Sequence, residues 1–156
     1  LPIYLCVMKS LSKSHGIGGL RLGVLASGDE NLIAALKKDV AIWNINSFGE
    51  FYMQIAEKYK KSYASALTLF REERKRFIEE LSTIRGLRVI PTQANYVMVE
   101  LSNGMTAKEL TKILLLKYNL FVKDLTKKCS GQYLRFAIRN TEDNQKLLEA
   151  LNQIML

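Results

Sequence analysis

The first part of the chain alternates short apolar runs with polar ones, and this pattern predicts two strands followed by a helix. Residues 3–8 are apolar and partly β-branched without a helical period, so they predict a buried strand. A loop rich in Ser, Gly and Lys, with room for one helical turn, leads to a second strand at 20–27. Residues 27–40 predict a short helix with Ser27 or Asp29 as N-cap, acidic residues in its first turn and lysines in its last.

A long helical pattern occupies the middle of the chain. Apolar residues recur three or four positions apart from 48 to 84, and Ser47 is the predicted N-cap. No Gly or Pro interrupts the pattern after Gly49, so one helix that links two domains is expected. The alternative is two helices with a bend near residues 62–65.

The remaining residues change in character and predict a compact α+β module. Strand and helix patterns follow in the order β-β-α-β-β-α, with Thr106 and Thr141 as predicted N-caps of the two helices. The predicted strands lie at 87–91, 95–101, 120–125 and 133–139, and the predicted helices at 106–118 and 141–156.

Composition and charge narrow the classes of protein. The 156 residues are 48% hydrophobic and 24% charged, as in globular proteins, and no apolar run reaches the roughly 20 residues that span a bilayer. We therefore expect no membrane partner. The net charge of +8 is compatible with nucleic-acid binding. The basic residues are densest in 57–81, however, where acids alternate with them, and this is typical of a solvated helix face.

The cysteine and histidine content argues against a metal centre. Cys6, in the first predicted strand, and Cys129, in a loop, lack paired metal-ligand spacing, and we expect two free thiols in a reducing compartment such as the cytoplasm, with Cys6 buried. His15 is the sole histidine, which excludes a multi-histidine site. No metal is expected.

The motif SLSKSHGIGGLRLG, which begins at Ser10, contains a set of residues suited to pyridoxal phosphate. Lys13 supplies an amine that forms a Schiff base with a carbonyl group. Ser10, Ser12 and Arg21 supply hydroxyls and a guanidinium for a phosphate, and the glycines between them allow tight turns. The motif is neither a P-loop nor G-x-G-x-x-G. A polar connection that happens to contain a lysine is the competing interpretation.

The spacing S-x-S-K-x7-R-x-G resembles the cofactor-lysine motif of fold-type I, class I/II aminotransferases. It is most similar to the branch that contains histidinol-phosphate aminotransferase and threonine-phosphate decarboxylase, where SLSK, GLRLG and a WNxNS-like loop recur. The resemblance implies that Lys13 is catalytic, forming the Schiff base with pyridoxal 5'-phosphate and moving protons. It implies that Ser10 and Arg21 bind the cofactor phosphate, with Ser12 a weaker candidate.

The resemblance extends to the end of the chain and implies a substrate site. The segments TQANYVMVEL and YLRFAIRNTEDNQKLLEAL resemble the corresponding strands of the family's small domain, whose arginine binds the substrate carboxylate and maps onto Arg135. A planar guanidinium suits a carboxylate because it donates two parallel hydrogen bonds. Asn95 is expected either to contact the substrate or to order its loop.

Arg139 suggests a second anionic group on the substrate. It lies four residues after Arg135, and the period of two along a strand places both on one face. Their mutual repulsion favours a substrate with a carboxylate and also a phosphate or phosphonate. An Arg139 that points to solvent at the end of its strand is an equally weighted alternative.

The resemblance also implies the domain organisation. Residues 1–47 would be the C-terminal remnant of a large α/β cofactor-binding domain, 48–84 the linking helix, and 85–156 the small α+β domain. No Asp precedes Lys13 to hold a pyridine nitrogen, so we expect an N-terminal half outside this sequence to be a necessary partner. The isolated chain is expected to be inactive and to self-associate, and the family implies a homodimer.

The expected function is therefore part of an aminotransferase that acts on a small amino acid or amine with a second anionic group. Decarboxylation of a phosphorylated amino acid is the alternative, because both reactions use these residues. A basic binding module without catalysis, for nucleic acid or an acidic partner, and a catalytically dead scaffold are the alternatives from other classes. We do not expect nucleic-acid binding, since it leaves the lysine motif unexplained.

Overall fold

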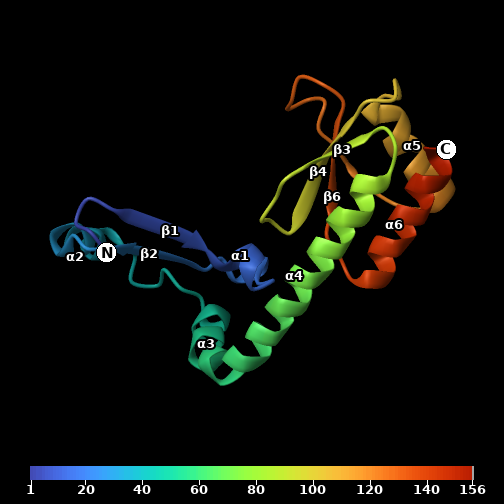
Figure 1. Ribbon diagram of the computed structural model, residues 1–156. Coiled ribbons are helices and arrows are strands. Elements are labelled where there is room, and N and C mark those ends of the chain that lie inside the picture. Colours follow the sequence, from blue (N-terminus) through green and yellow to red (C-terminus); the bar gives the residue numbers. More distant parts are fainter. Residues whose placement is uncertain (156) are drawn as a thin grey trace. The chain divides into compact units, whose positions relative to one another are not determined.

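The computed structural model describes residues 1–155 and divides the chain into two compact units, Leu1–Tyr63 and the residues from Ala64 onward (Figure 1). The first unit contains strands and short helices, and the second contains a sheet with helices. Helix α4, Lys60–Thr83, begins in the first unit and continues into the second. Among the described residues no helix is long and apolar enough to cross a membrane.

The first unit is built on an antiparallel two-stranded ribbon, followed by helices. The ribbon pairs β1 with β2. Its elements are β1 (Cys6–Ser10), α1 (Leu11–Ser14), the 3-10 turn η1 (Gly18–Leu20), β2 (Gly23–Ser27), α2 (Glu30–Asp39), α3 (Ser47–Ala56) and the 3-10 turn η2 (Glu57–Tyr59).

Burial of the first strand was predicted wrongly. All residues of β1 are exposed, including Cys6, whose thiol is free, and Met8, which is 81% exposed. The ribbon has two strands, and two strands alone cannot enclose an apolar face. The first unit therefore presents apolar side chains to solvent in the described chain.

The long helical pattern is divided in the structure. Helix α3 ends at Ala56, the 3-10 turn η2 intervenes, and α4 begins at Lys60. The division comes before the bend considered at 62–65. The N-cap of α3 is Asn46 and not Ser47, because the Asn46 Oδ1 accepts from the amide of Gly49 at 2.9 Å. Of the two candidates for α2, Asp29 is the N-cap.

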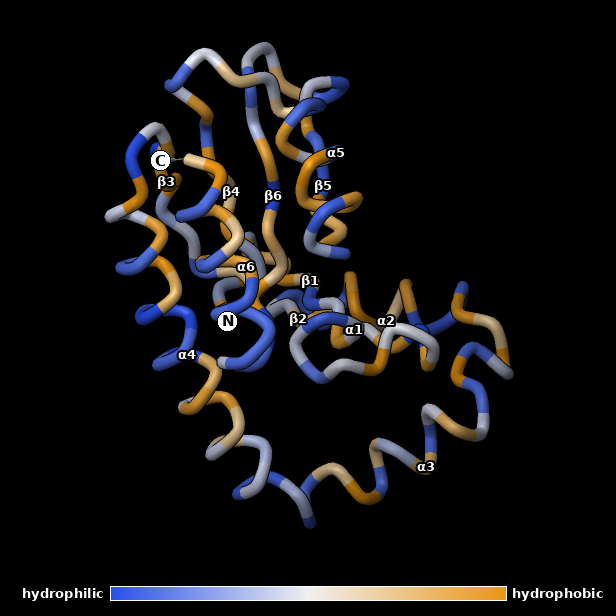
Figure 2. The backbone as a smooth tube through the Cα atoms, turned by 90° about the vertical axis from the view of Figure 1, so that its right-hand side faces the viewer, coloured by the Kyte–Doolittle hydropathy of each residue, from blue (hydrophilic) through white to orange (hydrophobic). Residues whose placement is uncertain are grey.

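The second unit confirms the predicted β-β-α-β-β-α order. Four antiparallel strands form a sheet in the order β3-β4-β6-β5, with helices α4, α5 and α6 along one side (Figure 1). Hydrophobic positions recur three or four residues apart along α4 (Figure 2). The new elements are β3 (Leu87–Ile90), β4 (Tyr96–Leu101), α5 (Ala107–Tyr118), β5 (Lys123–Asp124), β6 (Tyr133–Ala137) and α6 (Thr141–Ile154).

The core of this unit lies between the helices and one face of the sheet. Alternate residues of the central strands are buried, and the residues between them are not. The fully buried side chains include Phe77 and Leu81 of α4, Val97 and Val99 of β4, Leu134 and Phe136 of β6, Leu110 and Leu114 of α5, and Leu148 and Leu151 of α6. Within the described part of the second unit, the opposite face of the sheet is therefore not covered by helices and is accessible to a ligand.

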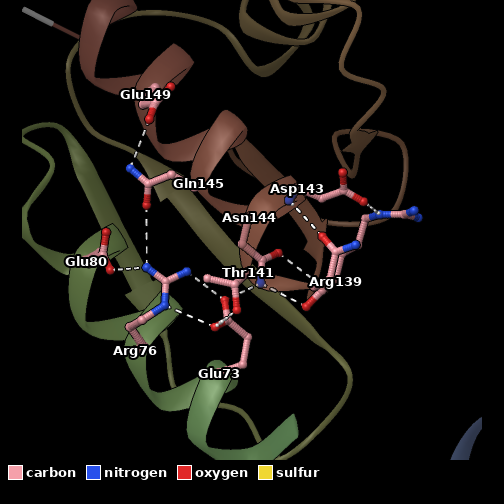
Figure 3. A network of polar contacts seen from close by, with 10 residues as sticks. Glu73, Arg76, Glu80, Arg139, Thr141, Asp143, Asn144, Gln145 and Glu149 are labelled. Atoms are coloured by element: carbon pink, nitrogen blue, oxygen red, sulfur yellow. Dashed lines mark hydrogen bonds and ion pairs between the residues drawn. The ribbon is translucent and has the colours of Figure 1, made fainter. Parts of the chain in front are cut away.

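A carboxylate on α4 joins this helix to the start of α6 (Figure 3). Glu73 accepts from Arg76 at 2.7 Å and from two residues of α6, Thr141 at 2.8 Å and Asn144 at 2.7 Å. Its side chain is 13% exposed. The hydroxyl of Thr141 therefore donates to Glu73 and does not cap the helix. The N-cap of α6 is Asn140 rather than the predicted Thr141.

These contacts hold the pKa of Glu73 far below its ordinary value, at about 2, and the hydrogen bond from Arg76 is the largest cause. A carboxylate whose pKa is lowered in the folded state stabilises the fold at pH values above its pKa in the unfolded state. This contribution is lost as the pH falls toward the folded-state pKa of about 2. The interaction is therefore fully present at neutral pH.

We expect Glu73→Gln to lower the free energy of unfolding at pH 7 by about 1–3 kcal/mol, because Arg76, Thr141 and the buried Asn144 lose a charged acceptor. The difference from wild type should shrink as pH falls below about 4.5. Urea unfolding followed by circular dichroism at several pH values measures both. Glu79→Gln is the control, because its ion pair with Lys75 is exposed and 3.9 Å long. A difference independent of pH would contradict this account.

Candidate functional site

The lysine motif folds into a turn at one end of the β1–β2 ribbon. Ser10 ends β1 and lies opposite Gly23 of β2, and the amide of Leu11 donates to the carbonyl oxygen of Leu22 at 3.0 Å. This register brings Ser10 and the turn that carries Lys13 to the same end of the ribbon as Arg21. The first unit therefore gathers the predicted cofactor residues in one place.

The backbone of this turn is shaped by local hydrogen bonds. The Ser10 Oγ is the N-cap of α1 and accepts from the amide of Ser12 at 3.4 Å. Arg21 adopts a left-handed conformation, with φ 56°, which is uncommon for a residue other than glycine. Its Nη1 donates to the carbonyl oxygen of Gly18 at 3.2 Å. The strained conformation turns the chain sharply before β2.

The donor set of this turn fits a phosphorylated aldehyde. Arg21 and Lys13 are both exposed, and neither forms an ion pair with a carboxylate within residues 1–155. A guanidinium and a serine hydroxyl suit a phosphate group, and an accessible primary amine suits a carbonyl carbon. Ser10, Lys13 and Arg21 would therefore hold pyridoxal phosphate, with the side chain of Ser12 a further candidate.

The second group of predicted residues lies on the second unit. Arg135 is in the middle of β6 and is exposed on the face of the sheet opposite the core. Its register partners are Met98 on β4 and Lys123 on β5. The guanidinium lies over the ring of Tyr96, with 5.1 Å from Cζ to the ring centroid. The open face therefore presents two adjacent cationic side chains.

The carboxylate on this open face is already engaged. Glu100 on β4 accepts from Arg88 Nε at 2.6 Å and also from Tyr133. The hydrogen bond from Arg88 is the main cause of a lowered pKa for Glu100, and the bond to Glu100 raises the pKa of Tyr133. Arg135 and Lys123 form no ion pair with a carboxylate in the described part of the chain. Two unpaired cations side by side suit an anionic ligand.

Lys123 was not among the predicted site residues. Its place opposite Arg135 depends on strand register across a loop, which composition does not reveal. The one signal in the sequence was the K-D pair within LFVKDL, since a charged residue in an otherwise apolar strand indicates an exposed face.

The structure corrects the argument made for Arg139. Strand β6 ends at Ala137, so Arg139 does not share a strand face with Arg135. Its Nε donates to Asp143 Oδ2 at 2.7 Å, and its amide donates to Asn144 Oδ1 at 2.9 Å (Figure 3). No bound anion is needed to balance Arg139, because Asp143 already does so.

Asn95 lies exposed at the residue before β4, where two neighbours fix its backbone. Its carbonyl oxygen accepts from the amide of Ile138 at 3.0 Å. The guanidinium of Arg74 donates to the carbonyl oxygen of Gln93 at 2.6 Å and to that of Ala94 at 3.3 Å. The loop is therefore ordered without its asparagine side chain, which leaves that amide available for a ligand.

The comparisons with known proteins decide the family. The family model for aminotransferase class I and II matches residues 2–151. The chain belongs to the aminotransferase class I and II family. Members of this family use pyridoxal 5'-phosphate, which agrees with the donor set around Lys13.

The curated relatives include a histidinol-phosphate aminotransferase of Desulfitobacterium hafniense, 32% identical over 97% of this chain and 41% of that one, and also a decarboxylase. The chain is 35% identical to L-serine phosphate decarboxylase of Sulfurospirillum multivorans over 96% of its length and 39% of that protein. It is 33% identical to CMP-5'-(3-aminopropyl)phosphonate synthase of Streptomyces rubellomurinus over 96% of this chain and 24% of that one. The chain therefore spans less than half of each curated relative.

The solved structures confirm the predicted fold class. The histidinol-phosphate aminotransferase from Clostridium acetobutylicum superposes with a TM-score of 0.85 and 29% identity, over 97% of this chain and 46% of that one. The structural neighbours are pyridoxal-phosphate enzymes of fold type I, and this chain contributes a small α+β domain and a long helix of that fold.

We expect Lys123→Gln to raise the free energy of unfolding by about 0.2–1 kcal/mol at low salt, because like charges directly opposite in a sheet repel. The gain should largely disappear in 1 M salt, where exposed charges are screened. Urea unfolding at two salt concentrations measures this effect. Lys112→Gln on the exposed side of α5 is the control. A loss of stability at both salt concentrations would show that Lys123 is not repelled.

Proposed function

We propose that this chain is part of a pyridoxal-phosphate aminotransferase that acts on an amino acid or amine with a second anionic group. The observation that carries the proposal is the gathering of Ser10, Lys13 and Arg21 at one end of the β1–β2 ribbon, inside the segment matched to the family. When bound, the cofactor would supply an aldehyde and an electron-accepting ring. Lys13 would bond to it and move protons.

Substrate recognition is proposed for the open face of the sheet. Arg135 would bind a carboxylate through two parallel hydrogen bonds. Lys123, its register partner on β5, would bind the second anionic group as a point charge. Asn95 offers an amide to the ligand. Arg139 stays a weaker candidate because Asp143 already occupies its guanidinium.

Decarboxylation of a phosphorylated amino acid is the second candidate. L-serine phosphate decarboxylase is 35% identical to this chain, and the residues named above suit either reaction. The two differ in which bond at the substrate carbon is held perpendicular to the cofactor ring. We propose amino-group transfer as the main reaction and decarboxylation as its alternative.

The partners and location follow from the family and from the surface of the first unit. We propose that an N-terminal region and a second copy of the protein complete the site, since Met8, Trp43 and Phe48 are largely exposed. The domain roles proposed are cofactor binding for 1–47, linkage for 48–84 and substrate binding for 85–156. A cytoplasmic location is proposed because both Cys6 and Cys129 are free.

The cofactor proposal is tested by incubation with pyridoxal phosphate, borohydride reduction and peptide mass spectrometry. We expect a stoichiometric adduct on Lys13 in the full-length protein and its loss in Lys13→Ala. Lys9→Ala is the matched control, because Lys9 is an exposed lysine of β1 just before the turn. Labelling spread over many lysines and unchanged in Lys13→Ala would refute the proposal.

The substrate proposal is tested with O-phospho-L-serine as probe. We expect Arg135→Ala to raise KM about 10- to 100-fold, because charged hydrogen bonds are lost, and Lys123→Ala about tenfold. Arg139→Ala should change KM less than about threefold, because its charge is already paired. Amino transfer to a 2-oxo acid and release of carbon dioxide are both assayed. Equal effects of all three substitutions would contradict the assignment.

A further inference from the structure

The turn that carries Lys13 is too short to hold its own shape. Helix α1 has four residues, and the amide of His15 donates to the carbonyl oxygen of Leu11 at 3.1 Å to close one helical turn. A single turn is unfavourable alone, because several backbone dihedrals are fixed for each hydrogen bond formed. The last carbonyl groups of a helix also lack partners within it. Contacts from outside the turn must therefore fix the position of Lys13.

Tyr63 makes two such contacts, both inside the first unit. Its hydroxyl donates to the carbonyl oxygen of Ser14 at 2.9 Å, and Ser14 is the last residue of α1. Its ring stacks on the imidazole of His15, with centroids 4.5 Å apart and planes 2° apart. One side chain of α4 therefore holds the two residues that directly follow Lys13.

The imidazole of His15 is held from other directions as well. The Ser14 Oγ lies 2.9 Å from its Nδ1, and the ring of Tyr52 on α3 meets it edge-on at 6.3 Å. His15, Tyr52 and Tyr63 are half-buried, whereas Lys13 is exposed. The two tyrosine rings both pack against the imidazole, and the turn that carries Lys13 is attached to them through Ser14 and His15.

We propose that Tyr63 and His15 form a clasp that positions Lys13 for its reaction with the cofactor, an inference that rests on the proposed function. In that reaction the neutral amine condenses with the aldehyde carbon, one water leaves with the carbonyl oxygen, and no oxidation state changes. The rate depends on where the amine is held, because small misplacements of reacting groups are costly. Tyr63 and His15 touch neither reacting atom, so they are positioning residues.

The experiment measures the rate of adduct formation on Lys13 in the full-length protein, by borohydride trapping after timed exposure to pyridoxal phosphate. Tyr63→Phe removes the hydroxyl and keeps the stacked ring, and should slow the reaction about fivefold. His15→Ala removes the stacking partner and should slow it about two- to tenfold. His15→Phe restores a flat ring and should recover the rate to within about twofold of wild type. Tyr59→Phe, a half-exposed tyrosine of η2, is the matched control.

A second measurement separates positioning from a loss of structure. Pyridoxine 5'-phosphate has the cofactor phosphate but no aldehyde, so its affinity reports Ser10 and Arg21 without reaction at Lys13. The clasp predicts that this affinity stays within about twofold of wild type in Tyr63→Phe while adduct formation slows. The melting temperature of each variant is also measured and compared with the assay temperature.

The outcomes separate this inference from the proposed function. Adduct formation at the wild-type rate in both Tyr63→Phe and His15→Ala overturns the clasp and leaves the proposed function standing. Parallel loss of pyridoxine 5'-phosphate binding and adduct formation also overturns it, since the residues would then only maintain the fold. Absence of an adduct on Lys13 in the wild type overturns the proposed function and the clasp with it.

Discussion

The second unit depends on the carboxylate of Glu73, which is nearly buried where α4 meets the start of α6. Asn144 donates to Glu73 and to the carbonyl oxygen of Arg139, and it accepts from the amide of Arg139 (Figure 3). The chain therefore leaves β6 along a fixed path. The same network thus fixes the backbone at the end of the strand that carries Arg135.

Each of the two candidate regions carries an arginine that is not paired with a carboxylate among the described residues. The carboxylates of Glu73, Glu100 and Asp143 are committed to Arg76, Arg88 and Arg139. By contrast, Arg21 in one unit and Arg135 in the other form no ion pair with a carboxylate in residues 1–155. Unpaired cations on an ordered scaffold cost some stability, and anionic ligands recover it. The net charge of +8 is compatible with small anionic ligands as well as with nucleic acid.

Much of the fold was readable from the sequence because helical and strand periods determine elements locally. The family was also predicted correctly from the spacing of the lysine motif and of the segment around Arg135, while the roles of these residues stay predictions. Properties that depend on tertiary contacts could not be predicted in this way. The position of Lys123 opposite Arg135 depends on the register of β5 against β6. The exposure of Cys6 depends on the ribbon having only two strands. The shared strand face predicted for Arg139 failed because β6 ends at Ala137, two residues earlier, and Asp143 of α6 pairs with the guanidinium.

Helix α4 is best understood as the element to which both candidate regions are attached. Tyr63 binds the turn after Lys13, and Arg74 binds the carbonyl groups that precede Asn95. Phe77 and Leu81 continue the same helical stripe into the core of the second unit. The apolar periodicity that predicted a linker thus also describes a row of anchoring side chains.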